Sequence, residues 1–155
     1  MLVKGFTLIE LLIVLAIGGL IAGLAGPAFS RLPSGSQLDE VARDLEQVIR
    51  LARERSVAGV ASSTNGVLLE LNSGIPDRYI LFRGTSYAGR DSTYDEATEI
   101  REAIELNSAL TNSATEITFS PLTGIPSATG TITLNHSTGD NRVLQLNDLG
   151  LVSPE

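Results

Sequence analysis

Residues 6–30 read FTLIELLIVLAIGGLIAGLAGPAFS and decide the organisation of this 155-residue chain. Glu10 carries the one charge in this stretch, and the twenty residues from Leu11 to Ser30 carry none. As a helix, a segment of that length spans about 30 Å, which is the hydrocarbon thickness of a bilayer. A buried core helix is the alternative, but core helices keep a polar face that this stretch lacks. We therefore expect residues 6–30 to form a transmembrane helix.

A cleaved secretory signal is a second alternative for the N-terminus. Lys4 gives it a weakly basic start, and cleavage after Ala25 or Ala28 would follow small residues, as a signal peptidase requires. The apolar run is, however, longer than the core of about 7–15 residues in an ordinary signal. Glu10 also has no role in such a signal. Because a charge in an apolar phase costs a few kcal/mol, this carboxylate requires a positive partner.

A cut between Gly5 and Phe6 would supply that partner. The new α-amine of Phe6 would lie about one helical turn from Glu10, and the two charges attract strongly in low dielectric, within one chain or between neighbouring chains. Residues 4–10, KGFTLIE, resemble the class III signal of type IV pilins and type II secretion pseudopilins. The resemblance implies that prepilin peptidase cuts after Gly5 and methylates Phe6, and that Glu10 registers the subunits.

The apolar stretch contains several small residues and one proline. Gly19 and Gly23 form a small-xxx-small pair, which lets helix backbones approach closely in lipid or in a filament core. Glycine is also common in membrane helices, so the pair has two interpretations. Pro27 and the glycines make this segment easy to kink. In the pilins that the N-terminus resembles, a proline often interrupts the helix at this place.

Residues 36–59 predict an amphipathic helix that follows a polar break at 31–36. Ser36 is a suitable N-cap, and apolar residues recur at spacings of three and four as far as Ala52. The helix is expected to end by Gly59. The arginines at positions 50, 53 and 55 are interpreted as a solvated face, with a partner site as the alternative. Two i,i+4 ion pairs are expected, Asp39–Arg43 and Glu46–Arg50.

Beyond this helix, an apolar period of two predicts short strands. Residues 138–141, TGDN, predict a hairpin turn between the last two of them. A helix packed on antiparallel strands gives an α+β head. The chain is therefore expected to consist of a leader at 1–5, a transmembrane helix at 6–30 and an amphipathic helix with a β-rich head at 31–155. The expected strands are Val67–Leu71, Tyr79–Arg83, Thr98–Leu106 (or a helical turn), Ile117–Phe119, Thr131–Leu134 and Arg142–Leu146.

The C-terminal half resembles the GspH/FimT-like family of minor pilins and pseudopilins. The pattern consists of ITFSPLTG at 117–124, GTITL at 130–134, RVLQL at 142–146 and Gly150. The helix end LARERS matches in part, since Arg55 replaces a residue that is usually small. The resemblance implies a pilin-like fold, in which a long N-terminal helix packs on an antiparallel sheet, and a structural subunit rather than an enzyme.

The composition excludes most kinds of catalytic or metal site. With no Cys and one His, thiolate and multi-His sites are excluded, and neither catalytic residues nor a cofactor nor a metal is expected. His136 is expected to be a solvated residue at a hairpin end. The remaining alternative is a Ca²⁺ ion at the acidic loop Asp91, Asp95 and Glu96, whose spacing fits no EF-hand.

The net charge of −7, from 11 basic and 18 acidic residues, disfavours binding to nucleic acid. The resemblance implies a minor pseudopilin of a type II secretion pseudopilus, held in the inner membrane with its head in the periplasm or outside. Its expected partners are prepilin peptidase and other pilin or pseudopilin subunits. The alternatives are a type IV pilus minor pilin used in adhesion, motility or DNA uptake, and a secreted binding module with a cleaved signal.

Overall fold

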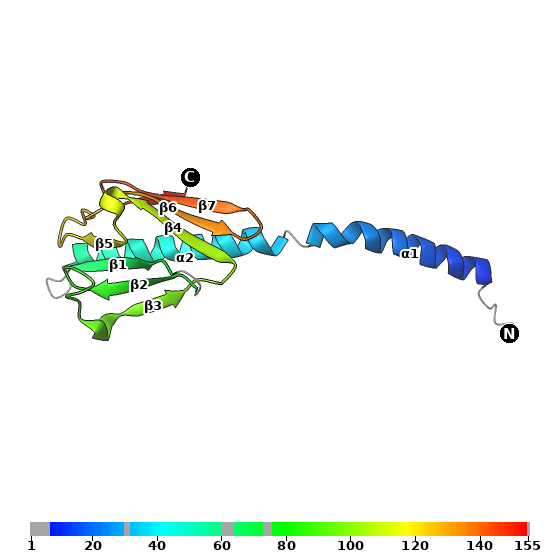
Figure 1. The fold of residues 1–155 in the computed structure, drawn as a ribbon, viewed down its shortest axis with the longest axis horizontal. Coiled ribbons are helices and arrows are strands. Elements are labelled where there is room, and N and C mark those ends of the chain that lie inside the picture. The colour runs from blue at the N-terminus through cyan, green and yellow to red at the C-terminus, as the bar shows by residue number, and fades with distance from the viewer. Residues whose placement is uncertain (1–6, 30–31, 60–63, 73–75, 155) are drawn as a thin grey trace. The chain divides into compact units, whose positions relative to one another are not determined.

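The computed structural model describes residues 7–29, 32–59, 64–72 and 76–154 (Figure 1). The chain divides into two compact units, Met1–Gly35 and Ser36–Glu155. The first unit contains helix α1, Leu8–Phe29, and the second contains most of helix α2, Leu32–Val57, together with all the strands.

Helix α1 is apolar and exposed over its described side chains, from Leu8 to Ile21. Its backbone stays helical through Pro27 and ends at Phe29. Among the described residues, no helix is long and apolar enough to cross a membrane. The predicted span has its two ends, Phe6 and Ser30, outside the described residues.

Helix α2 begins at Leu32, four residues before the N-cap predicted at Ser36. The prediction was wrong because Pro33 fits the first turn of a helix, where its missing N–H would have no intrahelical partner. The predicted end is confirmed, since the helix stops at Val57 and Gly59 has a φ of +61° that suits glycine after a helix. The predicted apolar stripe is buried at Leu38, Ala42, Leu45, Ile49 and Ala52.

The strands form two antiparallel four-stranded sheets, which we call sheet A and sheet B. Sheet A has the order β3-β2-β1-β5 and consists of β1 Asn65–Glu70, β2 Arg78–Arg83, β3 Glu96–Glu99 and β5 Glu116–Phe119. Sheet B has the order β4-β6-β7-β8 and consists of β4 Ile104–Leu110, β6 Gly130–His136, β7 Asn141–Leu146 and β8 Val152–Pro154. Two short 3₁₀ turns, η2 Ser92–Tyr94 and η3 Thr111–Ser113, lie in the loops.

One hydrophobic core joins α2 to both sheets. The strands of both sheets lie along α2 (Figure 1), and the buried stripe of the helix packs with side chains of each sheet. Sheet A contributes Tyr79 and Phe119, and sheet B contributes Ile132 and Leu144, all of which are almost fully buried. The expectation of an α+β head with a helix on antiparallel strands is therefore confirmed.

The strand predicted at Thr98–Leu106 was wrong, because these residues belong to two sheets. The Ile104 N–H donates to the Arg101 carbonyl at 2.8 Å, and this turn separates β3 from β4. Strand β3 pairs with β2, whereas β4 pairs with β6. The other five predicted strands are present with small shifts at their ends. The predicted hairpin turn is also confirmed, with Gly139 at a φ of +96° between β6 and β7.

A buried carboxylate forms hydrogen bonds that link the two sheets. Asp77, just before β2, is 8% exposed, and its Oδ2 accepts a hydrogen bond from the Leu106 N–H of β4 at 2.7 Å. Its Oδ1 accepts from the Asn72 N–H at 2.7 Å, and its backbone carbonyl accepts from the Ile100 N–H at 2.8 Å. The side chain thus satisfies one backbone donor in β4 of sheet B and one in the loop between β1 and β2 of sheet A.

Candidate functional site

Glu10 lies in the first turn of α1, where its negative charge is favoured by the helix dipole. Thr7 caps this turn: its Oγ1 accepts from the Glu10 N–H at 3.4 Å, and its carbonyl accepts from the Leu11 N–H at 3.2 Å. The Glu10 carboxylate is exposed and forms no ion pair with any described residue. Gly5 and Phe6, the predicted cleavage and methylation site, lie outside the described residues.

The described part of α1 presents an uncovered apolar surface. Leu8 is 78% exposed and Leu20 is 68% exposed, and a Cβ added at Gly19 would meet nothing within 4 Å. Burial of one such leucine contributes about 1.5–3 kcal/mol, so this surface favours a covering of lipid or of other helices. The close helix packing at Gly19 and Gly23 and the kink at Pro27 stay predictions.

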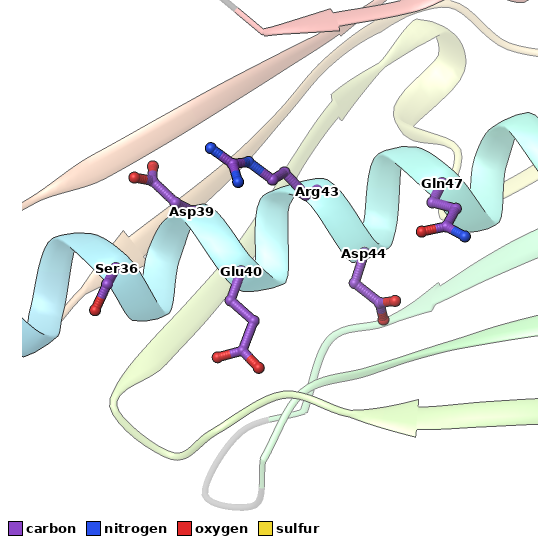
Figure 2. Close-up of a pocket in the computed structure, with 6 residues that line it drawn as sticks. All are labelled: Ser36, Asp39, Glu40, Arg43, Asp44 and Gln47. Atoms are coloured by element: carbon purple, nitrogen blue, oxygen red, sulfur yellow. The ribbon is translucent and has the colours of Figure 1, made fainter.

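The outward face of α2 carries carboxylates that fasten the helix to both sheets. Asp39 pairs with Arg142 of β7 at 2.7 Å rather than with the predicted Arg43, while Asp44 accepts a hydrogen bond from the Tyr79 hydroxyl of β2. Asp39 and Asp44 point to opposite sides of the helix (Figure 2). A shallow groove of about 550 Å³ follows this face and is lined by Ser36, Asp39, Glu40, Arg43, Asp44 and Gln47.

The Tyr79–Asp44 contact makes the stability of the head depend on pH. Burial raises the pKa of the Tyr79 phenol well above its ordinary value of 10.0, and the hydrogen bond to Asp44 adds to this effect. The folded state therefore holds the phenolic proton more tightly than the unfolded state does. This contribution to stability is fully present below about pH 10 and is lost as the pH rises toward the raised value.

We expect the free energy of unfolding to fall above about pH 10 in the wild type and to fall less steeply in Tyr79→Phe, which has no proton to lose. Below that pH, Tyr79→Phe should be less stable by about 1 kcal/mol, because it lacks one hydrogen bond. Denaturant titrations between about pH 8 and 11.5 measure both effects. Tyr94→Phe is the matched control, since Tyr94 is 50% exposed. Equal pH slopes for Tyr79→Phe and the wild type would contradict the assignment.

The arginines near the end of α2 lie on a partly exposed face and also bond to other parts of the head: the side chain of Arg50 is 57% exposed and that of Arg55 is 37% exposed. The Arg53 Nε donates to the Leu149 carbonyl at 3.1 Å, and Arg55 pairs with Glu96 of β3 at 2.8 Å. Arg50 forms the predicted pair with Glu46 at 2.5 Å and also donates to the carbonyl of Val152.

Two glycines make room for the Arg53 side chain. An added Cβ would lie 3.1 Å from Arg53 at Gly124 and 3.0 Å from it at Gly150. Both glycines have a positive φ, at +68° and +73°. Two loops that are distant in sequence therefore close around the last turns of α2, and this arrangement depends on glycine at both positions.

The acidic loop uses its carboxylates within the head. Hydrogen bonding from the Thr93 side chain, and then from the Thr93 N–H at 3.1 Å, lowers the pKa of Asp91, while Asp95 pairs with Arg90 at 2.7 Å. In the part of the chain that the structure describes, no group of three or more potential ligands is placed to hold a metal ion. His136 lies at the end of β6, half-buried, with its Nδ1 2.8 Å from the Thr138 hydroxyl.

Two family models match the chain and account for both of its units. The prokaryotic N-terminal methylation motif matches residues 1–26, and the type II transport protein GspH matches residues 41–150. The chain belongs to the GspH family. It is a minor pseudopilin of the type II secretion class, a structural protein and not an enzyme. The N-terminal motif implies a prepilin of the inner membrane.

A solved structure shares the fold of this GspH-family chain. The type IV minor pilin FimU of Pseudomonas aeruginosa is 16% identical in sequence, with a TM-score of 0.56 over 77% of this chain and 89% of that chain. At this identity the likeness concerns the fold alone, and it confirms the predicted pilin-like architecture. No curated protein matches the chain in sequence.

Proposed function

We propose that prepilin peptidase cuts this GspH-family subunit between Gly5 and Phe6 and methylates Phe6, after which the subunit is assembled into a type II secretion pseudopilus. The observation that supports this proposal is the N-terminal methylation motif on residues 1–26. That motif ends within α1, the exposed apolar helix that carries Glu10 in its first turn. Along the sequence, the proposed cleavage site is followed first by the acid that registers the subunit and then by the uncharged apolar stretch that serves assembly.

Before assembly, residues 1–5 are a cytoplasmic leader, residues 6–30 are held in the inner membrane, and residues 31–155 form the head in the periplasm or outside. The exposure of α1 supports this arrangement, because exposing this many apolar side chains to water is unfavourable and burying them in lipid is favourable. Assembly then exchanges lipid for neighbouring helices, so that 6–30 enters the filament core. The subunit contacts other pilin-like subunits through this segment.

The α-amine of Phe6 in one subunit pairs with the Glu10 carboxylate of a neighbour. Glu10 is exposed in an apolar segment and forms no ion pair with a described residue. No described residue therefore neutralises the negative charge of its carboxylate. In the apolar core of a filament the pair is strongly attractive, whereas an unpaired charge is costly. The position of Glu10 thereby sets the axial register of the subunits.

A type IV pilus is the second candidate for the filament that takes up this subunit, because a minor pilin of such a pilus, FimU, has the same fold. Genes for a secretin and a secretion ATPase next to this gene would favour the pseudopilus. A retraction ATPase gene in their place would favour the pilus and its roles in adhesion, motility or DNA uptake. Processing at Gly5 is common to both candidates.

The mass of the N-terminal peptide of the protein purified from its native membrane tests the proposal. We expect methylated Phe6 as the first residue. Gly5→Val should accumulate the uncut precursor, because a bulky side chain is placed at the scissile bond, while Leu2→Val, also in the leader, should be processed normally. A mature start after Ala25 or Ala28 would indicate a secreted binding module. An uncut precursor that functions normally would also overturn the proposal.

A further inference from the structure

The face of sheet B that turns away from α2 carries uncharged polar side chains. Leu106 of β4, Ile132 of β6 and Leu144 of β7 are buried in the core that contains α2. Because side chains alternate along a strand, the residues next to them point to the opposite face. The pairing register sets these residues side by side, with Asn107 of β4 opposite Thr133 of β6. We call the residues of this outer face the polar array: Glu105, Asn107, Ala109, Thr131, Thr133, Asn135, Asn141, Val143, Gln145 and Ser153.

The polar array presents donors and acceptors that the described chain does not use. Its side chains are all at least partly exposed. Carboxamides and hydroxyls can each donate and accept a hydrogen bond. They are repeated at about 4.8 Å from strand to strand and at about 6.8 Å along one strand. Within the described residues, no side-chain hydrogen bond is formed by these members of the array: Asn107, Thr131, Thr133, Asn135 and Gln145.

The polar array is nearly neutral, although the chain has a net charge of −7. Glu105, on the edge strand β4, is the one charged member of the array. A nucleic acid requires basic residues, and the array contains none. A protein partner is also disfavoured, because the centres of protein interfaces are enriched in aromatic residues, methionine and arginine, and the array lacks all of these.

The outer face of sheet A has a different character. Ile80 and Phe82 of β2 are only 3% and 1% exposed, and the Tyr87 ring contacts the Phe82 ring edge-on, with 5.5 Å between the centroids. Glu70 and Arg78 form an ion pair on the same face. Sheet A therefore covers its outer face with the chain's own side chains, whereas sheet B leaves a neutral polar surface open to a ligand.

We propose that the polar array binds a neutral linear polysaccharide. Sugar hydroxyls donate and accept hydrogen bonds as the amides and hydroxyls of the array do, and they carry no charge. An extended chain of sugars crosses several strands and forms many weak bonds at once, so its affinity exceeds that of a single sugar. The inference does not depend on cleavage at Gly5 or on a filament, because sheet B forms the whole array.

Co-sedimentation of the purified full chain with insoluble neutral polysaccharides tests the proposal. The probes are cellulose, chitin and cross-linked dextran, and the chain is kept in a detergent without a sugar headgroup. We expect retention on at least one of the three. That retention should be equal at low and high NaCl concentrations, because salt screens only contacts between charges. Retention on none of the probes, or retention that high salt abolishes, would overturn the proposal.

Thr133→Val removes one hydroxyl from the centre of the array and keeps the shape of the side chain. Valine suits a strand as well as threonine does, so the melting temperature should not fall. Retention should nevertheless weaken about fivefold, the loss expected for one hydrogen bond. Thr118→Val on β5 is the matched control, because Thr118 is a half-buried strand residue outside the array. Wild-type retention in Thr133→Val, or equal losses in both variants, would overturn the proposal.

Asn107→Asp tests whether the neutrality of the array matters. The substitution keeps the size of the side chain, removes its donor and adds a negative charge, so retention should fall about tenfold. Asn112→Asp adds the same charge in η3, outside the array, and should bind like the wild type. If Asn107→Asp also bound like the wild type, the array would not be the site of binding and the proposal would fail.

Discussion

Replacing Glu10 with alanine is expected to leave a folded, processed protein whose incorporation into filaments is reduced roughly 100-fold. Loss of one partner of a buried ion pair costs about 3–5 kcal/mol, because the other charge remains in an apolar environment. A cost of about 3 kcal/mol already corresponds to a factor of about 100 in an association equilibrium. The quantity to measure is the ratio of filament-bound to membrane-bound subunit, determined by shearing and immunoblotting.

Two variants locate the origin of the Glu10 effect. Glu10→Gln keeps the size and hydrogen-bonding capacity of the side chain without its charge, so it should be nearly as defective as alanine. Glu105→Ala, which removes an exposed carboxylate of β4, should assemble normally. If Glu10→Gln assembled like the wild type, the interaction would not be an ion pair, and the proposed role of the Phe6 amine would have to be abandoned.

Replacing Asp77 with alanine is expected to lower the free energy of unfolding by about 2–4 kcal/mol. The carboxylate accepts hydrogen bonds from the N–H groups of Asn72 and Leu106, both at 2.7 Å. Without it these donors lose their partner, and an unsatisfied buried donor costs about 1–3 kcal/mol. The larger share of the loss should come from the Leu106 N–H, which is fully buried. Denaturant titration of the full chain in detergent measures the change.

Asp148→Ala is the matched control for Asp77→Ala. Asp148 is an exposed carboxylate in the β7–β8 loop, so Asp148→Ala should lie within about 0.5 kcal/mol of the wild type. Asp77→Asn retains one acceptor but directs an amide donor at the second N–H, so its stability should fall between alanine and the wild type. An Asp77→Ala variant as stable as the wild type would show that water replaces the carboxylate at both donors.

Local patterns determined much of this protein. The α2 stripe follows from apolar spacings of three and four, which place one side of a helix against whatever covers it. The turn at residues 138–141 follows from Gly139 between two short alternating segments. The residues of KGFTLIE and ITFSPLTG carried the family assignment, which the matches on residues 1–26 and 41–150 confirm.

Contacts between residues distant in sequence decided the rest. Residues 98–106 are divided between two sheets because β3 finds its partner in β2 and β4 finds its partner in β6. Asp39 bonds Arg142, 103 positions away, although Arg43 is one helical turn away. The bonds of Asp77 and the enclosure of Arg53 by two glycines likewise have no local signal. The periodic spacing of apolar residues specifies which face of a helix or strand is buried. Only the packed chain specifies the hydrogen-bond or ion-pair partner of each polar group.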